Sequence, residues 1–501
     1  MSRTPQFFDD ASLHYEGPQT STGVIRRLDQ LSLFSMFWAI AVLFHLLRPE
    51  LTTVILRFDL KALLNVALCI TAAALLVNPR SIVLLFALAL IQIFDYFAGM
   101  PLGSNHYTMA FFLSSSIVAS YLYFQITGGG EEIRRQAFYE AWASVGRYLL
   151  LIMYFFGIFH KINVDWFDPL VSCAVALTDA IVVPWNLKSD WLDQFVIYGT
   201  LIVEGLAIVF LCIPRLKYLG FLIGVPLHII IGFTPYNWYL NYSSLVVALY
   251  VLFLPGDFPE RLRHLVEKYS LNKAIDWVAQ NRSAILLFFV GVIGLAAAFV
   301  GISLGLGVSR KAFGDFYKLF QMTAIGIWAL YSIPVYLLFM ILLVGSKYPT
   351  AKEYWLARPK WMLAFPIIFL LNGFTPYFGL KTEATISMFS NLHTEASTTN
   401  HLLLDPPPYL FDYQKSVVKI HSSSDPYLQK VAAHGWHLVE FDFWSRIQRN
   451  PDMAVTYAIN GEVRTLARAG DALPGHEQPW ILRKFLAFKP VDFERPKVCS
   501  H

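Results

Sequence analysis

Long apolar runs separated by short polar connections occupy most of the first 376 residues of this 501-residue chain. A helix that spans a bilayer needs about 20 predominantly apolar residues, because every backbone polar group must be paired inside the lipid. The runs therefore predict an all-α polytopic membrane bundle of about 11 transmembrane helices. The expected spans are 30–47, 60–78, 81–98, 107–126, 145–162, 192–213, 216–234, 241–254, 284–306, 319–345 and 361–376.

The composition supports this class of protein and argues against others. Apolar residues make up 56% of the chain and charged residues only 15%, which is more apolar surface than a soluble domain needs. No basic run or zinc-finger spacing is present, so we expect the lipid bilayer and no nucleic acid as a partner. The four cysteines are scattered and include no Cys-x-x-Cys pair, so neither a metal site nor a redox pair is indicated.

Basic residues are distributed unequally between the two sets of loops. With the N-terminus in the cytoplasm, about 18 Lys and Arg residues lie inside and about 8 outside, in agreement with the positive-inside rule. We therefore expect a protein of the bacterial inner membrane, or of the endoplasmic reticulum in a eukaryote, with an extracytoplasmic C-terminus. The expected parts are a cytoplasmic segment 1–29, a transmembrane core 30–255, an amphipathic helix followed by further spans in 256–376, and an extracytoplasmic domain 377–501.

The last 125 or so residues have the pattern of a small α+β domain outside the membrane. Asn460-Gly461 lies between two alternating segments, 454–459 and 462–467, which predicts a β-hairpin with a type I′ turn. The segment Trp436–Trp444 nearly alternates between apolar and polar residues and predicts a strand.

Lys161 follows an apolar run and is the residue that most suggests chemistry. On a helix, Tyr154, Gly157 and Lys161 share one face, and the glycine leaves space beside it. Such a lysine is either a snorkelling residue at the membrane interface or a functional residue. Withdrawal from water disfavours the ammonium, so Lys161 could act as a general base. From its place at a helix end, we expect Lys161→Ala to leave folding intact.

Two histidines are predicted at the same depth as Lys161. His106 begins the fourth span, after Asn105, and His228 lies within the seventh. Each is either an interhelical hydrogen-bonding residue or part of one pocket with Lys161, and we expect the three side chains to converge. Glu204 in the sixth span either pairs with Lys161 or His228, or holds helices together. His160 is expected at the membrane interface.

An aromatic loop contains Tyr236 and Trp238. Its simplest interpretation is an aromatic belt at the membrane surface. The alternative is that these rings form the wall of a site for an apolar, ring-shaped ligand.

The stretch Tyr154–Trp166 resembles the lysine-bearing segment of vitamin K-dependent γ-glutamyl carboxylase, and Asn105-His106-Tyr107 resembles the Asn-His motif of that family. His228 lies where a third family motif places a histidine. The wider group is the horizontally transferred transmembrane domain proteins of bacteria. The resemblance covers roughly residues 25–255, with Ser387–Asn391 as a fainter match after the last span.

The resemblance implies that Lys161 is the base that deprotonates vitamin K hydroquinone or a related reduced quinone. O2 then adds to the ring, giving an epoxide and a strong base that can remove a γ-proton from glutamate before CO2 is trapped. His106 would support the oxygenation and His228 would stabilise charge on the ring oxygen. The residues that would contact the quinone are Tyr154, Gly157, Asn105, Tyr236 and Trp238. Glu204 would lie behind these residues, and no metal is expected.

Three departures from the family concern the acceptor. The family's paired lysines become His160-Lys161 here, and an acidic residue two positions beyond the lysine becomes Asn163. The C-terminal domain is also shorter than the lumenal region of the carboxylase. Carboxylation of a protein or peptide substrate on the extracytoplasmic side is therefore an open alternative to epoxidation alone.

Two other classes of function remain in competition with an enzyme. One is a non-catalytic membrane maturation or assembly factor whose C-terminal domain binds a partner protein. The other is a transporter in which the His and Lys cluster gates the substrate. The sequence contains no inverted repeat with broken helices, which argues against transport.

Overall fold

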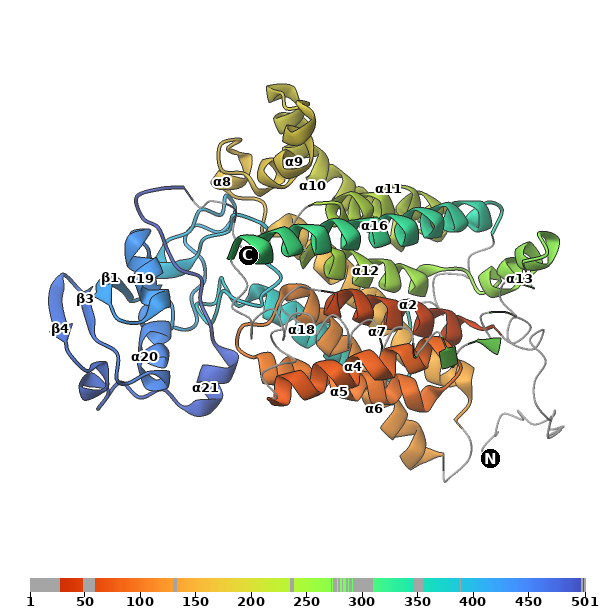
Figure 1. The fold of residues 1–501 in the computed structure, drawn as a ribbon, viewed down its shortest axis with the longest axis horizontal. Coiled ribbons are helices and arrows are strands. Elements are labelled where there is room, and N and C mark those ends of the chain that lie inside the picture. Colours follow the sequence, from red (N-terminus) through yellow and green to blue (C-terminus); the bar gives the residue numbers. More distant parts are fainter. Residues whose placement is uncertain are drawn as a thin grey trace, which may run out of the picture.

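A computed structural model describes residues 28–47, 59–128, 133–234, 238–271, 310–346, 355–387, 389–496 and 499, with scattered positions between 273 and 291. Figure 1 shows a bundle of long, roughly aligned helices with the smaller C-terminal domain at one end. The helices of the bundle are α2 (Gln30–Leu46), α4 (Leu60–Val77), α5 (Ile82–Gly99), α6 (Asn105–Thr127), α7 (Arg135–Phe159), α10 (Asp190–Cys212), α11 (Lys217–Gly232), α12 (Trp238–Tyr250), α16 (Arg310–Leu343) and α18 (Ala364–Phe374).

Among the described residues, seven helices are long and apolar enough to cross a membrane. The number becomes eight if α12 with its 3-10 extension and the following helix α13 (Phe258–Lys268), bent by 103°, are counted as one span. The chain therefore has the character of a multi-pass helical membrane protein. A total of about 11 spans is not confirmed: α2 and α18 are shorter apolar helices, and the predicted span 284–306 lies outside the continuously described residues.

The helix starts follow from local sequence. Asp29, Asp59 and Ser81 precede α2, α4 and α5, and each accepts a hydrogen bond from a backbone N–H of the first turn. The fifth predicted span, 145–162, begins too late, because α7 starts at Arg135. Hydropathy detects only the apolar part of this helix, whereas an ion pair between Arg135 and Asp29 holds its polar first turn against α2.

The core of the bundle is rich in aromatic side chains. Trp38, Trp142 and Trp328 are fully buried, and the indole N–H of Trp38 donates to Gln92 Oε1 at 2.9 Å. A polar side chain in a dry interior requires a partner, so this bond fixes the rotation of α2 against α5.

Between α7 and α10 the chain forms a protruding hairpin, visible at the top of Figure 1. It contains α8 (Val164–Phe167), α9 (Cys173–Val182) and a 3-10 turn, Val183–Trp185. Cys173 at the start of α9 forms a disulfide with Cys499. The sequence analysis did not foresee this disulfide. The two residues are 326 positions apart, so no local motif marks them.

The C-terminal domain contains one antiparallel sheet with strand order β2-β1-β3-β4. Its strands are β1 (Val417–Ser423), β2 (His437–Val439), β3 (Val455–Ile459) and β4 (Glu462–Leu466). Its helices are α19 (Pro426–Ala433), α20 (Glu440–Arg449) and α21 (Trp480–Phe485). The predicted hairpin is confirmed: Asn460 and Gly461 both have positive φ, as a type I′ turn requires.

The strand predicted over Trp436–Trp444 is wrong in its second half. Only His437–Val439 forms a strand, and α20 begins at Glu440. Phe441, Trp444 and Ile447 are buried at helical spacing, while acidic residues lie in the first turn of α20 and basic residues in the last, where they complement the helix dipole. Over nine residues the two periodicities overlap, so the strand pattern was ambiguous.

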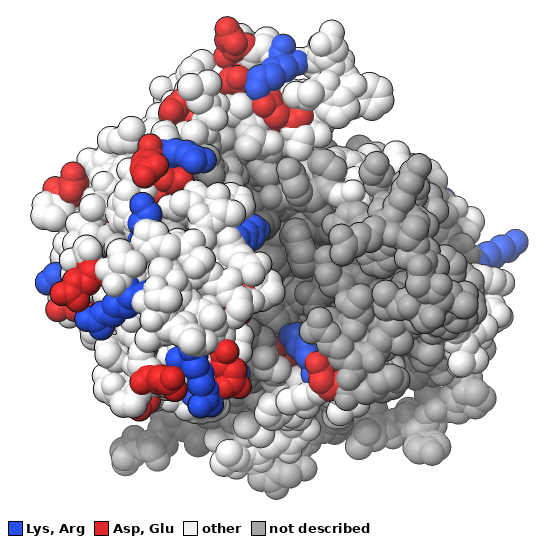
Figure 2. All heavy atoms as spheres, turned by 60° about the vertical axis from the view of Figure 1, so that its left-hand side comes forward, with Lys and Arg blue, Asp and Glu red and all other residues white. Residues whose placement is uncertain are grey.

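The remaining short elements are 3-10 turns, Pro214–Leu216, Val251–Phe253, Lys360–Leu363, Glu395–Ser397 and Ala469–Ala472. The amphipathic helix expected at the start of 256–376 corresponds to α13, which ends at Lys268. Figure 2 shows charged side chains of both signs interspersed over the described face of the C-terminal domain.

The segment after α18 joins the C-terminal domain to the bundle. The backbone N–H groups of Thr382 and Glu383 donate to the carbonyl of Ala487, at 3.1 Å and 3.0 Å. Three residues further on, the N–H of Ile386 donates to Asn105 Oδ1 at 2.6 Å. The C-terminal domain thus contacts the same end of the bundle as Asn105 and Lys161.

Candidate functional site

A cavity of about 450 Å³ lies among α6, α7, α9, α10, α11 and α12 at the end of the bundle nearest the C-terminal domain. Most of the side chains that line it are aliphatic or aromatic. Its ionisable side chains are His106, Lys161 and Glu204, and the amide of Asn105 lies beside them. The arrangement is that of a binding site for an apolar ligand with a few convergent polar groups.

Lys161 and Glu204 form a buried ion pair at the wall of this cavity. Lys161 Nζ lies 2.6 Å and 2.7 Å from the two carboxylate oxygens of Glu204, and both side chains are less than a tenth exposed. Of the two partners considered for Glu204 from sequence, the structure selects Lys161. The pairing makes burial tolerable, because neither charge is left alone in an apolar environment.

The end of α7 positions the amine. α7 ends at Phe159, and the N–H of Lys161 donates to the carbonyl of Ile158 at 2.9 Å. Asn163 then caps α8 by accepting from the N–H of Trp166, and its amide donates to the carbonyl of His160. The turn that carries Lys161 is therefore held on both sides.

Gly157 makes room for the carboxylate. A Cβ atom at this position would lie 3.3 Å from Glu204 Oε2, closer than most real Cβ contacts. On the other side of the amine, Lys161 Nζ lies 5.0 Å from the centre of the Trp166 ring, within cation–π range. The sequence placed Gly157 on the face of Lys161, and the structure shows that the space it leaves is occupied by Glu204.

Asn105 and His106 form the polar wall at the start of α6. The amide oxygen of Asn105 accepts a hydrogen bond from the backbone N–H of Ile386, which fixes the amide. His106 Nε2 lies 3.3 Å from Ser104 Oγ. The ring of His106 also lies 5.9 Å from that of Tyr242, centre to centre. Both residues thus line the same cavity as Lys161 and Glu204.

His228 and Tyr154 do not line this cavity but lie behind it. His228 Nε2 and Tyr154 Oη are 2.7 Å apart, and Tyr154 Oη is 2.8 Å from Tyr250 Oη. Pro226 lines the cavity, and residues two apart on a helix point in nearly opposite directions, so His228 faces away from it. The sequence predicted the depth of His228 but not the face on which it lies.

Two further expectations concern the aromatic loop and His160. Tyr236 and the side chain of Trp238 lie outside the described residues. The interfacial interpretation of His160 is wrong: its ring is fully buried, 3.2 Å from the carbonyl oxygen of Ile386 and 3.1 Å from that of Gly373. His160 therefore ties the end of α7 to α18 and the segment that follows it.

Sequence reasoning missed the part of the wall contributed by the residues after α18. Ile386 and Phe389 line the cavity, and Asn391 Oδ1 accepts from the N–H of Cys173 at the start of α9. The faint family match at Ser387–Asn391 was the one signal for this contact. The backbone N–H of Val164 also donates to the carbonyl oxygen of Asn400, so the segment after α18 contacts the start of α8 as well.

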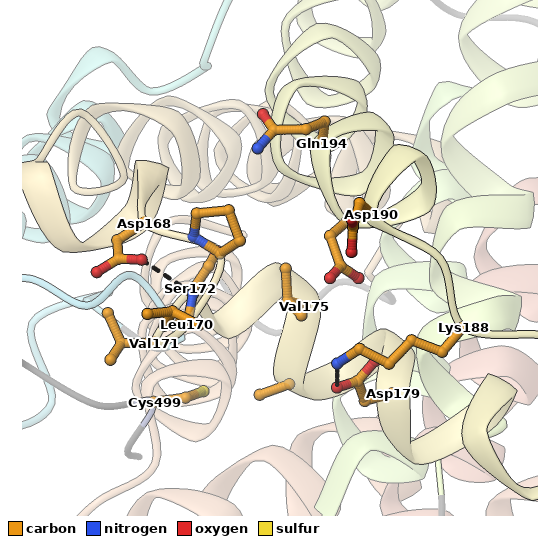
Figure 3. Close-up of a pocket in the computed structure, with 13 residues that line it drawn as sticks. Asp168, Leu170, Val171, Ser172, Val175, Asp179, Lys188, Asp190, Gln194 and Cys499 are labelled. Atoms are coloured by element: carbon orange, nitrogen blue, oxygen red, sulfur yellow. Dashed lines mark hydrogen bonds and ion pairs between the residues drawn. The ribbon is translucent and has the colours of Figure 1, made fainter.

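A larger pocket of about 870 Å³ lies on the outer side of α9 and α10 and has a different character. Figure 3 shows Asp168, Asp190 and an ion pair between Asp179 and Lys188 around it, with Cys499 at its edge. This pocket is an open acidic surface and contains no buried pair facing an apolar space. Among the residues that the structure describes, no three His, Cys, Asp or Glu side chains are grouped to hold a metal ion.

The fold and the cavity together define a multi-pass helical membrane protein with a buried Lys–Glu pair facing an apolar chamber. Comparisons of the chain with protein-family models, with curated proteins and with solved structures found no match. The carboxylase resemblance therefore rests on the residues quoted for it and remains a hypothesis.

Proposed function

We propose that this protein is an integral membrane enzyme that deprotonates a reduced quinone in the apolar cavity and oxygenates it to the epoxide. The observation that carries the proposal is the buried Lys161–Glu204 pair at the wall of a cavity otherwise lined mainly by apolar groups. The cavity volume of about 450 Å³ is within the usual range of small-molecule sites. A bicyclic hydroquinone such as that of vitamin K is the ligand class we assign to it.

Access from lipid supports a lipid-soluble substrate. Phe195, Leu222 and Ile230 line the cavity and are also exposed on the outer surfaces of α10 and α11. These helices belong to the set long and apolar enough to span a membrane, so their exposed apolar side chains would face lipid. A quinone could therefore enter sideways without crossing water.

The ion pair changes how the base is described. A Lys–Glu pair holds one proton between amine and carboxylate and can accept a second from the hydroquinone hydroxyl. Before the transfer the pair is neutral overall; afterwards it is positive and lies beside the quinolate anion. Overall, hydroquinone and O2 give quinone epoxide and water, which balances atoms and electrons. Asn105 and His106 lie where they could hydrogen-bond a ring oxygen.

We further propose that the C-terminal domain lies outside the cytoplasm and the N-terminus inside. The basic-residue bias supports this orientation. The Cys173–Cys499 disulfide supports it independently, because disulfides persist in oxidising compartments such as the periplasm or the lumen of the endoplasmic reticulum. A peptide acceptor for carboxylation would then approach from that side.

The test is mass spectrometry of the full-length protein in lipid nanodiscs, supplied with a reduced naphthoquinone, O2 and bicarbonate. We expect quinone epoxide, and a gain of CO2 on a glutamate-containing peptide if carboxylation is coupled. Lys161→Arg is the matched variant, since guanidinium stays protonated and holds a carboxylate in a two-point contact. Absence of epoxide with the wild type would refute the proposal, whereas near-normal epoxide with Lys161→Arg would assign the accepted proton to Glu204 and exclude the lysine amine as the base.

A further inference from the structure

A second cavity lies directly across the polar wall of the first. Its volume is about 520 Å³, and its lining includes His45, Lys61, Asp95 and Glu383. Asn105 and His106 line both cavities, so these two residues form the partition between an apolar chamber and a polar one. Below, the second cavity is called the outer polar pocket.

The outer polar pocket contains its own lysine–carboxylate pair. Lys61 Nζ lies 2.6 Å from Asp95 Oδ1, and the hydroxyl of Tyr107 donates to Asp95 Oδ2 at 2.6 Å. Asp95 is fully buried, whereas about a quarter of the Lys61 side chain is exposed. The sequence analysis did not foresee the pairing of Asp95 with Lys61. The pair connects the partition to solvent.

Aromatic contacts continue this path to His106. The ring of His45 stacks on Tyr107 with centres 4.3 Å apart and an interplanar angle of 8°. The centres of the His45 and His106 rings are 6.3 Å apart. Proton-exchanging side chains from α2, α4, α5 and α6 therefore meet on the outer face of the partition.

Coupled carboxylation would require such a path. In epoxidation alone, the hydroxide released with the epoxide takes up the hydroquinone proton. When the glutamate γ-proton leaves as water instead, the hydroquinone proton stays on the Lys161–Glu204 pair and must depart before the next turnover. Among the described side chains that line the apolar cavity, His106 is the titratable one besides the pair and Tyr242, and an imidazole can both accept and donate a proton. Its ring borders the pocket that reaches water.

We propose that the outer polar pocket is the aqueous outlet of the apolar cavity and that His106 carries protons across the partition. The inference rests on the proposed function with carboxylation coupled to it. A proton moves from the Lys161–Glu204 pair to one ring nitrogen of His106, and the other nitrogen releases a proton to water in the pocket. Proton transfer alone consumes no oxidant, and the imidazole returns to its neutral form. The charged and titratable groups facing this route are His45, Lys61, Asp95, Glu383, Tyr96, Tyr107, Tyr239 and Tyr242.

The first experiment does not depend on catalysis. Infrared spectroscopy after rapid dilution into D2O follows proton exchange at the carboxyl group of Glu204, whose band is assigned by subtracting the spectrum of Glu204→Gln. We expect exchange in His106→Gln to be slower than in the wild type by about 100-fold, the low end of what a positioned proton-transfer group contributes. Unchanged exchange would overturn the outlet.

Blocking the outer polar pocket with a bulky label tests whether protons leave through it. Leu102 lines the outer polar pocket and is largely exposed, so Leu102→Cys in a Cys212→Ser background can be labelled with a bulky thiol reagent. Labelling should slow the exchange at Glu204, whereas unlabelled Leu102→Cys should behave as the wild type. If the plugged protein exchanges at the wild-type rate, the pocket is not the outlet.

Turnover gives the second arm. With the glutamate-containing peptide and bicarbonate supplied, later turnovers of His106→Gln should slow about 100-fold more than its first turnover, each compared with the wild type, and should recover with added imidazole. An equal loss in first and later turnovers would overturn the relay in favour of a role in the chemistry. If the wild type forms no epoxide but His106→Gln still slows exchange, the proposed function fails and the outlet stands.

Discussion

Removing one member of the Lys161–Glu204 pair should cost far more stability than removing both. The two side chains are only 7% and 9% exposed, so the surviving charge in a single variant has little access to water. Breaking a buried pair in this way costs about 3–5 kcal/mol, whereas replacing both members by apolar residues of similar size is close to neutral. We therefore expect Lys161→Met and Glu204→Leu each to lose about 3–5 kcal/mol of stability, and the double variant to lose little. The earlier expectation that Lys161 can be removed without effect on folding is thereby replaced.

The assay is equilibrium unfolding in mixed micelles of detergent and dodecyl sulfate, with the four proteins forming a double-mutant cycle. The double variant serves as the control for activity: it should fold as well as the wild type but form no quinone epoxide. Losses below about 1 kcal/mol in both single variants would show that water reaches the pair, and the buried-pair argument would fail. Epoxide formation by the well-folded double variant would remove the base from the mechanism.

Three further predictions address the surroundings of the pair and the C-terminal domain. Gly157→Val should abolish turnover, because the added Cβ would lie 3.3 Å from Glu204 Oε2 and displace the carboxylate. Gly326→Val in α16 is the matched control, since a Cβ there has no atom within 4 Å. Equal activities of the two variants would contradict the packing argument. Burial raises the pKa of Asp442 to about 7, so the folded state binds its proton more tightly and the stability of the C-terminal domain should fall as pH rises from about 4 to about 7. Asp442→Asn should flatten that slope in hydrogen exchange of the sheet, and an unchanged slope would assign it to other groups. Cys499→Ser should lower stability by about 2–4 kcal/mol in thermal unfolding, with Cys212→Ser as the neutral control, and no loss would mean that the disulfide does not constrain the chain.

Seven of the predicted spans correspond to described helices that are long and apolar enough to cross a membrane. A run near 20 apolar residues has few alternatives to such a helix. The turn at Asn460-Gly461 was predictable for a similar reason, since few residues tolerate two consecutive positive φ values.

Pairings across the bundle were not predictable in the same way. Whether Glu204 meets Lys161 or His228 depends on helix rotation, and a rotation of about 100° per residue exchanges one face for another. The contact between Asn105 and Ile386 joins residues 281 positions apart and depends on how the chain returns after α18. No periodicity in either segment encodes such a return.

The pairing of an amine with a carboxylate has a physical consequence for catalysis in an apolar chamber. A lone amine there would lose its proton to avoid an isolated charge, and accepting one from a neutral quinol would create two charges with no compensation from the wall. With Glu204 beside Lys161, the proton enters a group that already contains a negative oxygen, and the resulting cation faces the new quinolate. Each state of the reaction then contains opposite charges in contact. For this reason we expect Glu204→Gln to lose epoxide formation even though Lys161 is retained, as measured by single-turnover mass spectrometry; full activity in Glu204→Gln would identify the amine alone as the base.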